Sequence, residues 1–351
     1  MNSQTTPAAA PLRWSIAAAL AAATLAFTGC GSGSPTGTED GGSSAGSPAT
    51  DGSGAGSGEL TSVSVGTIPI ASSTELRYGV AEGIFEDHGL DVELVEGQGG
   101  AALLPAVQNG SMEFAVGNPM SVLTAADQGL PMKVISGYSW SAPEGEDINA
   151  LVARKDSGIT GFEDLEGKTV TVNAVHTLGD LSIMEATDMA GGDPEKINFN
   201  EMAFPDMPAQ LEQGNVDAVW LPEPFLSRAL EDPENVVVGY PNQEVMDGMP
   251  LTIAFTSESM AAENPETVSA FRDALTDAAD QAAENEEEIR GMLPEFLKMD
   301  EETAQTIGLE PAHTDLPVEK MQTIYDLMLK YGMADNPMDV ESLYVEPPEQ
   351  Q

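Results

Sequence analysis

Basic side chains are scarce in this chain of 351 residues, where 13 lysines and arginines stand against 58 aspartates and glutamates, a formal net charge of −45. Binding to a nucleic-acid backbone requires clustered Lys and Arg, and the few present are scattered, so nucleic acid is excluded as a partner. No D-x-D-x-D-G loop is present. The acidic residues therefore indicate a solvated surface, as in a salty habitat, rather than calcium sites.

Catalytic and metal-binding motifs are missing from the chain beyond residue 58. That region has no G-x-S-x-G, no H-E-x-x-H and no cysteine, so it lacks the usual signatures of an activated nucleophile or a catalytic zinc. The three histidines are far apart in sequence, and none has a cysteine nearby. We therefore predict a protein that is not an enzyme and that needs no metal and no cofactor.

The only cysteine, Cys30, follows an apolar run from Ile16 to Phe27, which itself follows Arg13. This order of charge, apolar stretch and small residues is typical of an export signal. The cysteine resembles the lipid-modified cysteine of bacterial lipoproteins, although Phe27 stands where leucine is usual. We expect a signal peptide over 1–30, a lipid on Cys30, and localisation at the extracytoplasmic face of the cell membrane.

Residues 31–58 are almost entirely Gly, Ser, Thr, Pro and Ala, with no apolar periodicity. A segment of this composition has nothing to bury, which is typical of a disordered tether. The root-mean-square reach of such a flexible chain is roughly 30 Å. The folded part is expected to begin near Glu59.

The rest of the chain alternates short β-branched runs with helical patterns, which predicts an α/β protein. One α/β unit is expected over 59–145 and a second over 146–262. Within the first, the apolar positions Leu76, Val80 and Ile84 predict one helix that ends at Gly89. Apolar positions recur at helical spacing over 263–351 and predict helices that pack back on both units.

The two units resemble each other in one place. GSMEFAV at 110–116 aligns with GNVDAVW at 214–220, and each segment follows a short helix pattern and leads to a proline. Each segment begins with a glycine that ends the helix, has an acidic residue at the start of the strand and is followed by a proline. These matching positions favour two similar lobes.

Three longer stretches carry a resemblance to a known family. They are LRYGVAEGIFEDHGLDVELVEGQGGAALLPAVQNGSMEFAVGN, ITGFEDLEGKTVTVNA and MPAQLEQGNVDAVWLPEPF. These resemble the solute-binding proteins of ABC importers for nitrate, sulfonate, taurine and thiamine-precursor pyrimidines. The resemblance implies a two-lobed periplasmic-binding-protein-like fold of type II with a ligand cleft between the lobes. It also implies a small-molecule ligand, a membrane permease and its ATPase as partners; we expect a monomer.

The residues indicate a cleft independently of that resemblance. In α/β sheets, ligands bind where strands end and helices begin, because backbone N–H groups are unsatisfied there. Four such turns occur here, at 70–73, 98–101, 117–119 and 174–177. The residues predicted to contact the ligand, in these turns and near them, are Ser72, Ser73, Gln98, Gly99, Gly100, Ala101, Asn118, Tyr138, His176, Thr177, Trp220 and Glu223.

Several of these residues have a structural interpretation too. Ser72-x-x-Glu75 and Thr177-x-x-Asp180 both fit a capping box, and Asn118 before a proline is a good helix cap. The letters G-x-G-x-x-A at 97–102 fit a dinucleotide loop. That function is excluded because the following strand lacks an acidic residue at its end to hold a ribose.

We expect a small organic ligand with an anionic or strongly polar head, such as a sulfonate, nitrate or taurine, and a flat heterocycle such as a pyrimidine is the alternative. Four helix ends favour a solute with an anionic or strongly polar head. No arginine lies in the four turns, however, and Tyr138, Trp140, His176 and Trp220 suit a flat ring such as a pyrimidine. An exported enzyme of similar fold and a purely structural lipoprotein are the other classes of protein to test.

Overall fold

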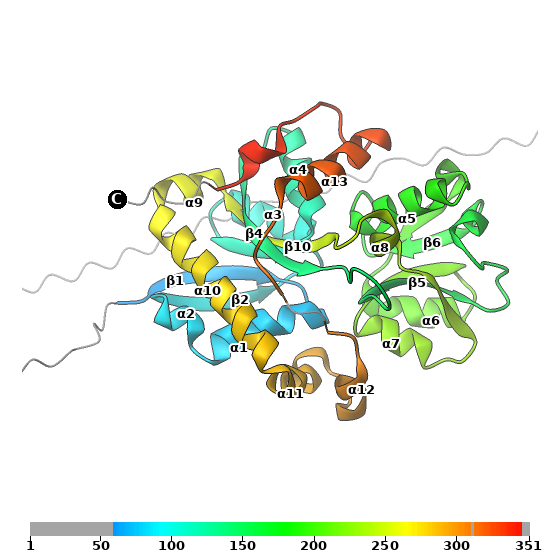
Figure 1. The fold of residues 1–351 in the computed structure, drawn as a ribbon, viewed down its shortest axis with the longest axis horizontal. Coiled ribbons are helices and arrows are strands. Elements are labelled where there is room, and N and C mark those ends of the chain that lie inside the picture. Colours follow the sequence, from blue (N-terminus) through cyan, green and yellow to red (C-terminus); the bar gives the residue numbers. More distant parts are fainter. Residues whose placement is uncertain (1–58, 310–311, 346–351) are drawn as a thin grey trace, which may run out of the picture. The chain divides into compact units, whose positions relative to one another are not determined.

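The computed structural model describes residues 59–309 and 312–345, so the predicted signal peptide, tether and lipidated Cys30 lie outside the described residues. The described part contains two five-stranded sheets with helices on their faces (Figure 1). No helix within these ranges is long and apolar enough to cross a membrane. Each sheet forms the centre of one lobe, which confirms the predicted two-lobed α/β fold.

The first sheet is built from β1 (Thr61–Thr67), β2 (Leu90–Glu96), β3 (Phe114–Gly117), β4 (Met132–Trp140) and β10 (Pro250–Ser257). Its strand order is β2-β1-β3-β10-β4. β2 and β3 run parallel to β1, whereas β10 runs antiparallel to both of its neighbours. The alternation of strands and helices in the sequence thus gives a largely parallel sheet with one reversed strand.

The second sheet is built from β5 (Asn149–Arg154), β6 (Thr169–Val172), β7 (Asn198–Glu201), β8 (Ala218–Pro222) and β9 (Asn235–Gly239). Its strand order is β7-β6-β8-β5-β9. β7 and β8 run parallel to β6, and β5 runs antiparallel to both of its neighbours. The pairing pattern therefore matches that of the first sheet strand for strand.

The predicted similarity of the two lobes extends to single hydrogen bonds. The carboxylate of Glu113, just before β3, accepts a hydrogen bond from the N–H of Ser64 in β1 at 2.7 Å. The carboxylate of Asp217, just before β8, accepts one from the N–H of Thr169 in β6, also at 2.7 Å. The acidic residue that the two aligned segments share ties the third strand to the first strand in both lobes.

The predicted boundary of the second lobe at residue 262 is wrong, because β10 belongs to the first sheet. All eight residues of β10 are buried, and the strand lies between β3 and β4. The chain therefore crosses between lobes twice, once after β4 and once before β10. The two crossing segments touch where the N–H of Ser141 donates to the carbonyl of Met249 at 2.9 Å.

Short helices cover the first sheet. They are the 3-10 turn η1 (Ala71–Ser73), α1 (Thr74–Ala81), α2 (Ile84–Asp87), α3 (Gly100–Gln108) and α4 (Pro119–Asp127). The single helix predicted up to Gly89 is divided in two by Gly83, which has a left-handed φ of 76°. Leu76 and Ile84 are nevertheless both buried, so the apolar stripe continues across the break.

The second sheet is covered by α5 (Leu178–Met189), α6 (Met207–Glu212), α7 (Phe225–Leu230) and α8 (Pro241–Val245), with 3-10 turns η2 (Phe162–Leu165), η3 (Pro194–Lys196) and η4 (Phe204–Asp206). Trp220, Val170 and Ile183 belong to one apolar cluster on one face of this sheet. A separate cluster on Met207, Leu211 and neighbouring residues of β5 and β8 covers the other side. Each lobe thus has its own core.

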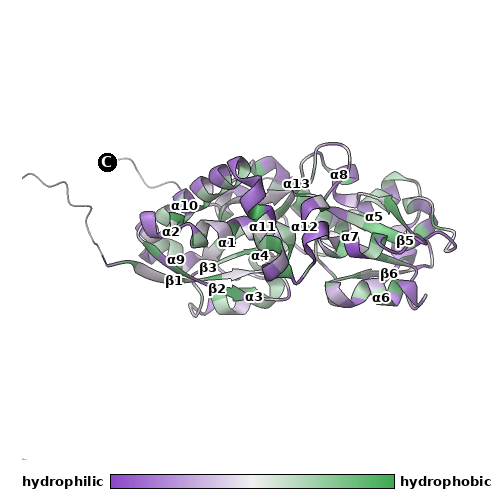
Figure 2. Ribbon diagram, turned by 90° about the horizontal axis from the view of Figure 1, so that it is seen from below, coloured by the Kyte–Doolittle hydropathy of each residue, from purple (hydrophilic) through white to green (hydrophobic). Residues whose placement is uncertain are grey.

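The carboxyl-terminal helices pack on the first lobe. They are α9 (Glu258–Glu263), α10 (Pro265–Glu284), α11 (Glu286–Leu297), α12 (Glu301–Thr306) and α13 (Val318–Lys330), followed by η5 (Val340–Leu343). On α10, the predicted apolar positions Val268, Phe271 and Leu275 are buried. The rings of Phe271 and Phe114 stack at 4.1 Å. In Figure 2 these helices mix hydrophilic and hydrophobic residues, as expected of helices with one buried face.

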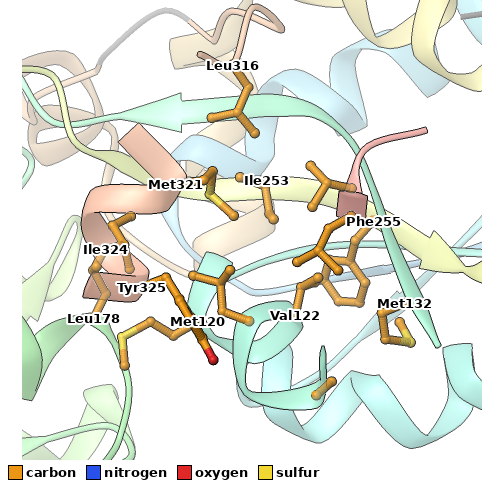
Figure 3. Packing of buried hydrophobic residues seen from close by; sticks show 14 of the residues in the cluster. Met120, Val122, Met132, Leu178, Ile253, Phe255, Leu316, Met321, Ile324 and Tyr325 are labelled. Carbon is orange, nitrogen blue, oxygen red and sulfur yellow. The ribbon is translucent and has the colours of Figure 1, made fainter. Parts of the chain in front are cut away.

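Helix α13 joins the two lobes. Figure 3 shows Met321, Ile324 and Tyr325 of α13 beside Met120 of the first lobe and Leu178 of the second, all members of one apolar cluster. At its end, Lys330 forms ion pairs with Glu185 and Asp188 of α5. The carboxyl-terminal region therefore packs on the first lobe and also contacts the second.

Candidate functional site

A cavity of about 230 Å³ lies between the two lobes. Its walls come from the turns after β1, β2, β3, β6 and β8, together with side chains of β4, β5 and β10. All four strand-to-helix turns predicted from the sequence contribute residues. The position follows the general rule that ligands of α/β folds bind at the carboxyl ends of parallel strands.

Nine of the twelve predicted contact residues line this cavity. They are Ser72, Gln98, Gly99, Gly100, Ala101, Asn118, Thr177, Trp220 and Glu223. The fold brings them together from both lobes, although they span about 150 positions of the sequence. Their contact with a ligand remains a prediction.

Three predicted contact residues lie outside the lining. Ser73 is buried within the first lobe beside the cavity-lining Ser72. His176 is exposed and has a left-handed φ of 58°. Tyr138 is buried in the first core, where its hydroxyl accepts a hydrogen bond from the N–H of Leu76 at 2.9 Å. Burial raises the pKa of Tyr138 well above its usual range, so its hydroxyl stays neutral.

Trp140, which was expected to help hold a flat ring, also lies outside the lining. Its indole stacks on the imidazole of His313 at 4.3 Å, and its N–H donates to the carbonyl of His313 at 3.0 Å. The ring and the N–H of Trp140 thus both make contacts inside the first lobe. The sandwich of four aromatic residues around a ring is therefore not formed, and Trp220 alone of the four faces the cavity.

Trp220 lies at the boundary between the cavity and the second core. It is 6% exposed and belongs to the apolar cluster of β6 and α5. A Cβ atom at Gly179 would lie 2.8 Å from the Cε3 atom of the indole, so only glycine lets the first turn of α5 lie against this ring. Phe204, another lining residue, is tilted toward the indole at 6.0 Å. These two rings form the aromatic wall of the cavity.

The glycines at 97–100 have two different roles. A Cβ atom at Gly100 would lie 2.7 Å from the hydroxyl of Ser121, so this glycine is required for the packing of α3 on α4. At Gly99 the corresponding atom would meet only the amide of Asn173 in the opposite lobe, at 3.5 Å. Gly99, rather than Gly100, is therefore the position where a side chain would obstruct the gap between the lobes.

Several of the helix ends at the cavity are already satisfied by the protein. Asp180 accepts hydrogen bonds from the N–H groups of His176 and Thr177 at the start of α5, at 2.6 and 2.7 Å. The predicted capping box of Thr177 and Asp180 is therefore present. The side chain of Asn118 accepts from the N–H of Met120 at the start of α4, as predicted.

The start of α3 is different. Among the described residues, none accepts a hydrogen bond from the N–H groups of Gly100 and Ala101. Both residues line the cavity. These two donors, on a nine-residue helix, can bind a ligand acceptor, as can the N–H groups of the lining residues Ser72 and Leu178, which also have no acceptor among the described residues.

The carboxylates around the cavity are buried. Glu223 lines it and accepts hydrogen bonds from the hydroxyl and the N–H of Ser227 at 2.8 and 3.1 Å. Asp147 accepts from the N–H of Ile148, a lining residue, at 2.8 Å. Burial raises the pKa of Glu223, Asp147 and Asp180 above the ordinary value.

Polar lining residues that the sequence reasoning missed come mainly from the strands. They are Ser121, Ser139, Asn149, Asn173 and Thr252. Asn149 begins an otherwise apolar buried strand, and a polar residue in such a run is a usable signal. Thr252 had no such signal, because β10 was assigned to the wrong lobe. Within the described ranges no group of acidic, histidine or cysteine side chains could hold a metal ion.

Comparison with known proteins gives relatives that match part of this chain in sequence. The chain is 24% identical over 236 residues to the nitrate import ATP-binding protein NrtC of Synechocystis, a match that covers 63% of this chain and 35% of that relative. It is 23% identical over 226 residues to a putative binding protein of Brucella abortus, covering 64% of this chain and 68% of that protein. The chain thus spans only about a third of NrtC and about two thirds of the Brucella protein.

Among solved structures, the chain resembles the periplasmic aliphatic sulphonate binding protein SsuA of Escherichia coli. The TM-score is 0.69 with 16% identity, and the match covers 81% of this chain and 97% of SsuA. At this identity the likeness concerns the fold. The model of the NMT1/THI5-like family matches residues 71–289, which include every strand of the two sheets except β1 and most of the cavity lining. The chain therefore belongs to the NMT1/THI5-like family.

Proposed function

We propose that this protein is the extracytoplasmic solute-binding component of an ABC importer. It captures a small organic solute with a polar head between its lobes and delivers it to a membrane permease driven by an ATPase. The observation that carries this proposal is the cavity lined by strand-end turns of two sheets with the same strand order. The relatives and structural neighbours, which include a nitrate import protein and a sulphonate binding protein, support it.

Attachment to the membrane is the second part of the proposal. Cys30, at the end of a signal-like apolar run, carries a lipid, and residues 31–58 link that anchor to the folded lobes. Cys30→Ser should release the protein from the membrane fraction into the medium. A variant that stays with the membranes would contradict the lipid anchor, but would leave the binding function untouched.

The binding function can be tested by asking whether the two lobes close when a solute binds. Two-lobed binding proteins gain affinity when a solute shifts them toward the closed form. Small-angle X-ray scattering of protein freed of solute by unfolding and refolding should give a larger radius of gyration, which falls when the solute is returned. Turnover of the solute would instead favour the exported enzyme. A radius that no small molecule changes, with no turnover, would favour a structural lipoprotein.

A further inference from the structure

The charges around the cavity set a limit on the ligand. Glu223 is the one acidic or basic residue in the lining, and the carboxylates of Asp147 and Asp180 accept hydrogen bonds from the N–H groups of the lining residues Ile148 and Thr177. No described lysine, arginine or histidine is part of the lining. Three acidic groups therefore surround the site without a compensating cation.

The helix ends do not supply that compensation. An anion usually binds at a helix start through free N–H groups and the positive end of the helix dipole. At α5 the helix start already carries an acidic side chain, because the carboxylate of Asp180 accepts from the N–H groups of His176 and Thr177 just before the helix. At α4 the side chain of Asn118 takes the N–H of Met120. The N–H groups of Gly100 and Ala101 at α3, and of Leu178 at α5, line the cavity and have no acceptor among the described residues. Helix starts with no basic side chain beside them, one of which already carries the carboxylate of Asp180, form a weak site for a charged sulfonate or nitrate.

The remaining walls suit an uncharged group. Phe204 and Trp220 provide an aromatic surface on one side. The side-chain amides of Gln98, Asn149 and Asn173 each offer both donors and acceptors. A compact ring with polar substituents can use both kinds of wall at once.

We propose, on the basis of the proposed binding function, that the cavity selects a compact neutral or cationic solute with a flat apolar part against Phe204 and Trp220, and that it rejects small anions. Burial of an anion beside Glu223 brings like charges together out of water, which disfavours binding. A neutral or positively charged head avoids this repulsion and gives Glu223 a donor or a counter-charge.

Three probes of the same shape test the charge preference. Benzamide, benzamidine and benzoate share one ring and carry a neutral, a positive and a negative head. Isothermal titration calorimetry on the purified protein should find benzamide or benzamidine bound at least tenfold more tightly than benzoate. Nitrate and ethanesulfonate should bind no better than benzoate. Equal or tighter binding of any of the three anions would overturn the charge preference and leave the importer function standing.

A charge introduced in the lining gives a second, independent test. Asn173→Lys places an ammonium group at the cavity, and Asn215→Lys makes the same change in the same lobe at an exposed position outside the lining. Asn173→Lys should raise the affinity for benzoate at least tenfold relative to benzamidine, whereas Asn215→Lys should leave the ratio unchanged. If the ratio of benzoate affinity to benzamidine affinity changes equally in both variants, or changes in neither, the proposal is contradicted. If no probe binds either variant or the parent protein, and no solute is carried by the protein in native mass spectrometry, the binding function itself fails.

Discussion

The two lobes start their first helix with the same sequence pattern and build it differently. Ser72-x-x-Glu75 follows β1, and Thr177-x-x-Asp180 follows β6, the matching strand of the second sheet. In the second lobe the carboxylate bonds to backbone N–H groups of the helix start, as a capping box requires. In the first lobe Glu75 is turned inward and accepts instead from the N–H of Ala312, at 3.3 Å.

The difference lies in what surrounds each helix. The first lobe is covered by the carboxyl-terminal segment, which brings Ala312 to Glu75, and β4 brings the hydroxyl of Tyr138 to the N–H of Leu76. The helix there also begins earlier, with the 3-10 turn η1, so Ser72 is no longer at a cap position. Tertiary contacts replace the local cap in the first lobe, whereas the second lobe keeps it.

Replacing one tryptophan in each lobe should change stability most. Trp220→Ala should lower the free energy of unfolding by roughly 3–5 kcal/mol because the ring is buried in the second core, and it should weaken solute binding because the same ring lines the cavity. Trp140→Ala should cost similar stability and leave affinity unchanged, since Trp140 stacks on His313 away from the cavity. Denaturant unfolding and titration calorimetry on both variants check this. Unaltered affinity in Trp220→Ala would remove this residue from the site.

The buried carboxyl of Glu75 in the first lobe should make stability depend on pH. Burial raises the pKa of Glu75 to about 8, above its value in the unfolded chain. The folded protein therefore keeps a proton that the unfolded chain loses, and stability should fall as pH rises from about 4.5 to about 8. At pH 9 Glu75→Gln should be more stable than the parent protein, by on the order of 3 kcal/mol. Denaturant unfolding across that pH range checks it, and a parallel pH profile for the two proteins would contradict the burial of this charge.

The cap of the second lobe should have a smaller effect. Asp180→Ala leaves the N–H groups of His176 and Thr177 without their acceptor. The expected loss of stability is about 1–2 kcal/mol, typical of a removed helix cap. Asp193→Ala, which removes an exposed cap of the short turn η3, is a suitable control with a lower expected cost. Equal unfolding midpoints for the Asp180 variant and the parent protein would show that the capping box does not stabilise the lobe.

The smallest expected effect concerns the contact between lobes. Lys330→Met removes the ion pairs of α13 with Glu185 and Asp188 of α5, which are partly exposed, so the expected cost is below about 1 kcal/mol. Because the pairs connect the first lobe to the second, the variant should bind solute a few-fold more weakly, with less dependence on salt. Titrations at low and high salt, with Lys298→Met as a control outside the contact, check this. Identical salt dependence in both variants would rule out a role of the pair in closure.

The sequence predicted the local structure better than the long-range pairing. Alternating patterns predicted the α/β fold, and all four turns predicted from the sequence contribute residues to the cavity lining. β10 was missed as part of the first sheet because its partners β3 and β4 lie more than a hundred residues earlier. An apolar run alone does not indicate which sheet its strand will join.

The error at Tyr138 has a different cause. Successive residues of a strand point to opposite faces of the sheet. Ser139 lines the cavity, so its neighbour Tyr138 points into the core on the other face. The alternation in β4 was readable from the sequence, but the face that meets the cavity depends on how the two lobes are placed. Side-chain chemistry alone had favoured the larger aromatic residue.

Gly99 is the position at which closure of the two lobes around a small solute can be tested. Because Gly99 has no side chain, a gap remains between it and Asn173 of the opposite lobe. The extended backbone at Gly99 tolerates any residue. Gly99→Val should weaken binding at least tenfold, about 1.4 kcal/mol, with an unchanged melting temperature. Gly291→Val, at an exposed position of α11 with open space around it, is the matched control.

Native mass spectrometry after incubation with the low-molecular-weight fraction of a cell extract provides the measurement. The parent protein and Gly291→Val should each carry one small molecule per chain, and Gly99→Val should carry none. Equal occupancy in all three proteins would contradict closure at this cavity, and the absence of any bound molecule from all three would contradict the binding function.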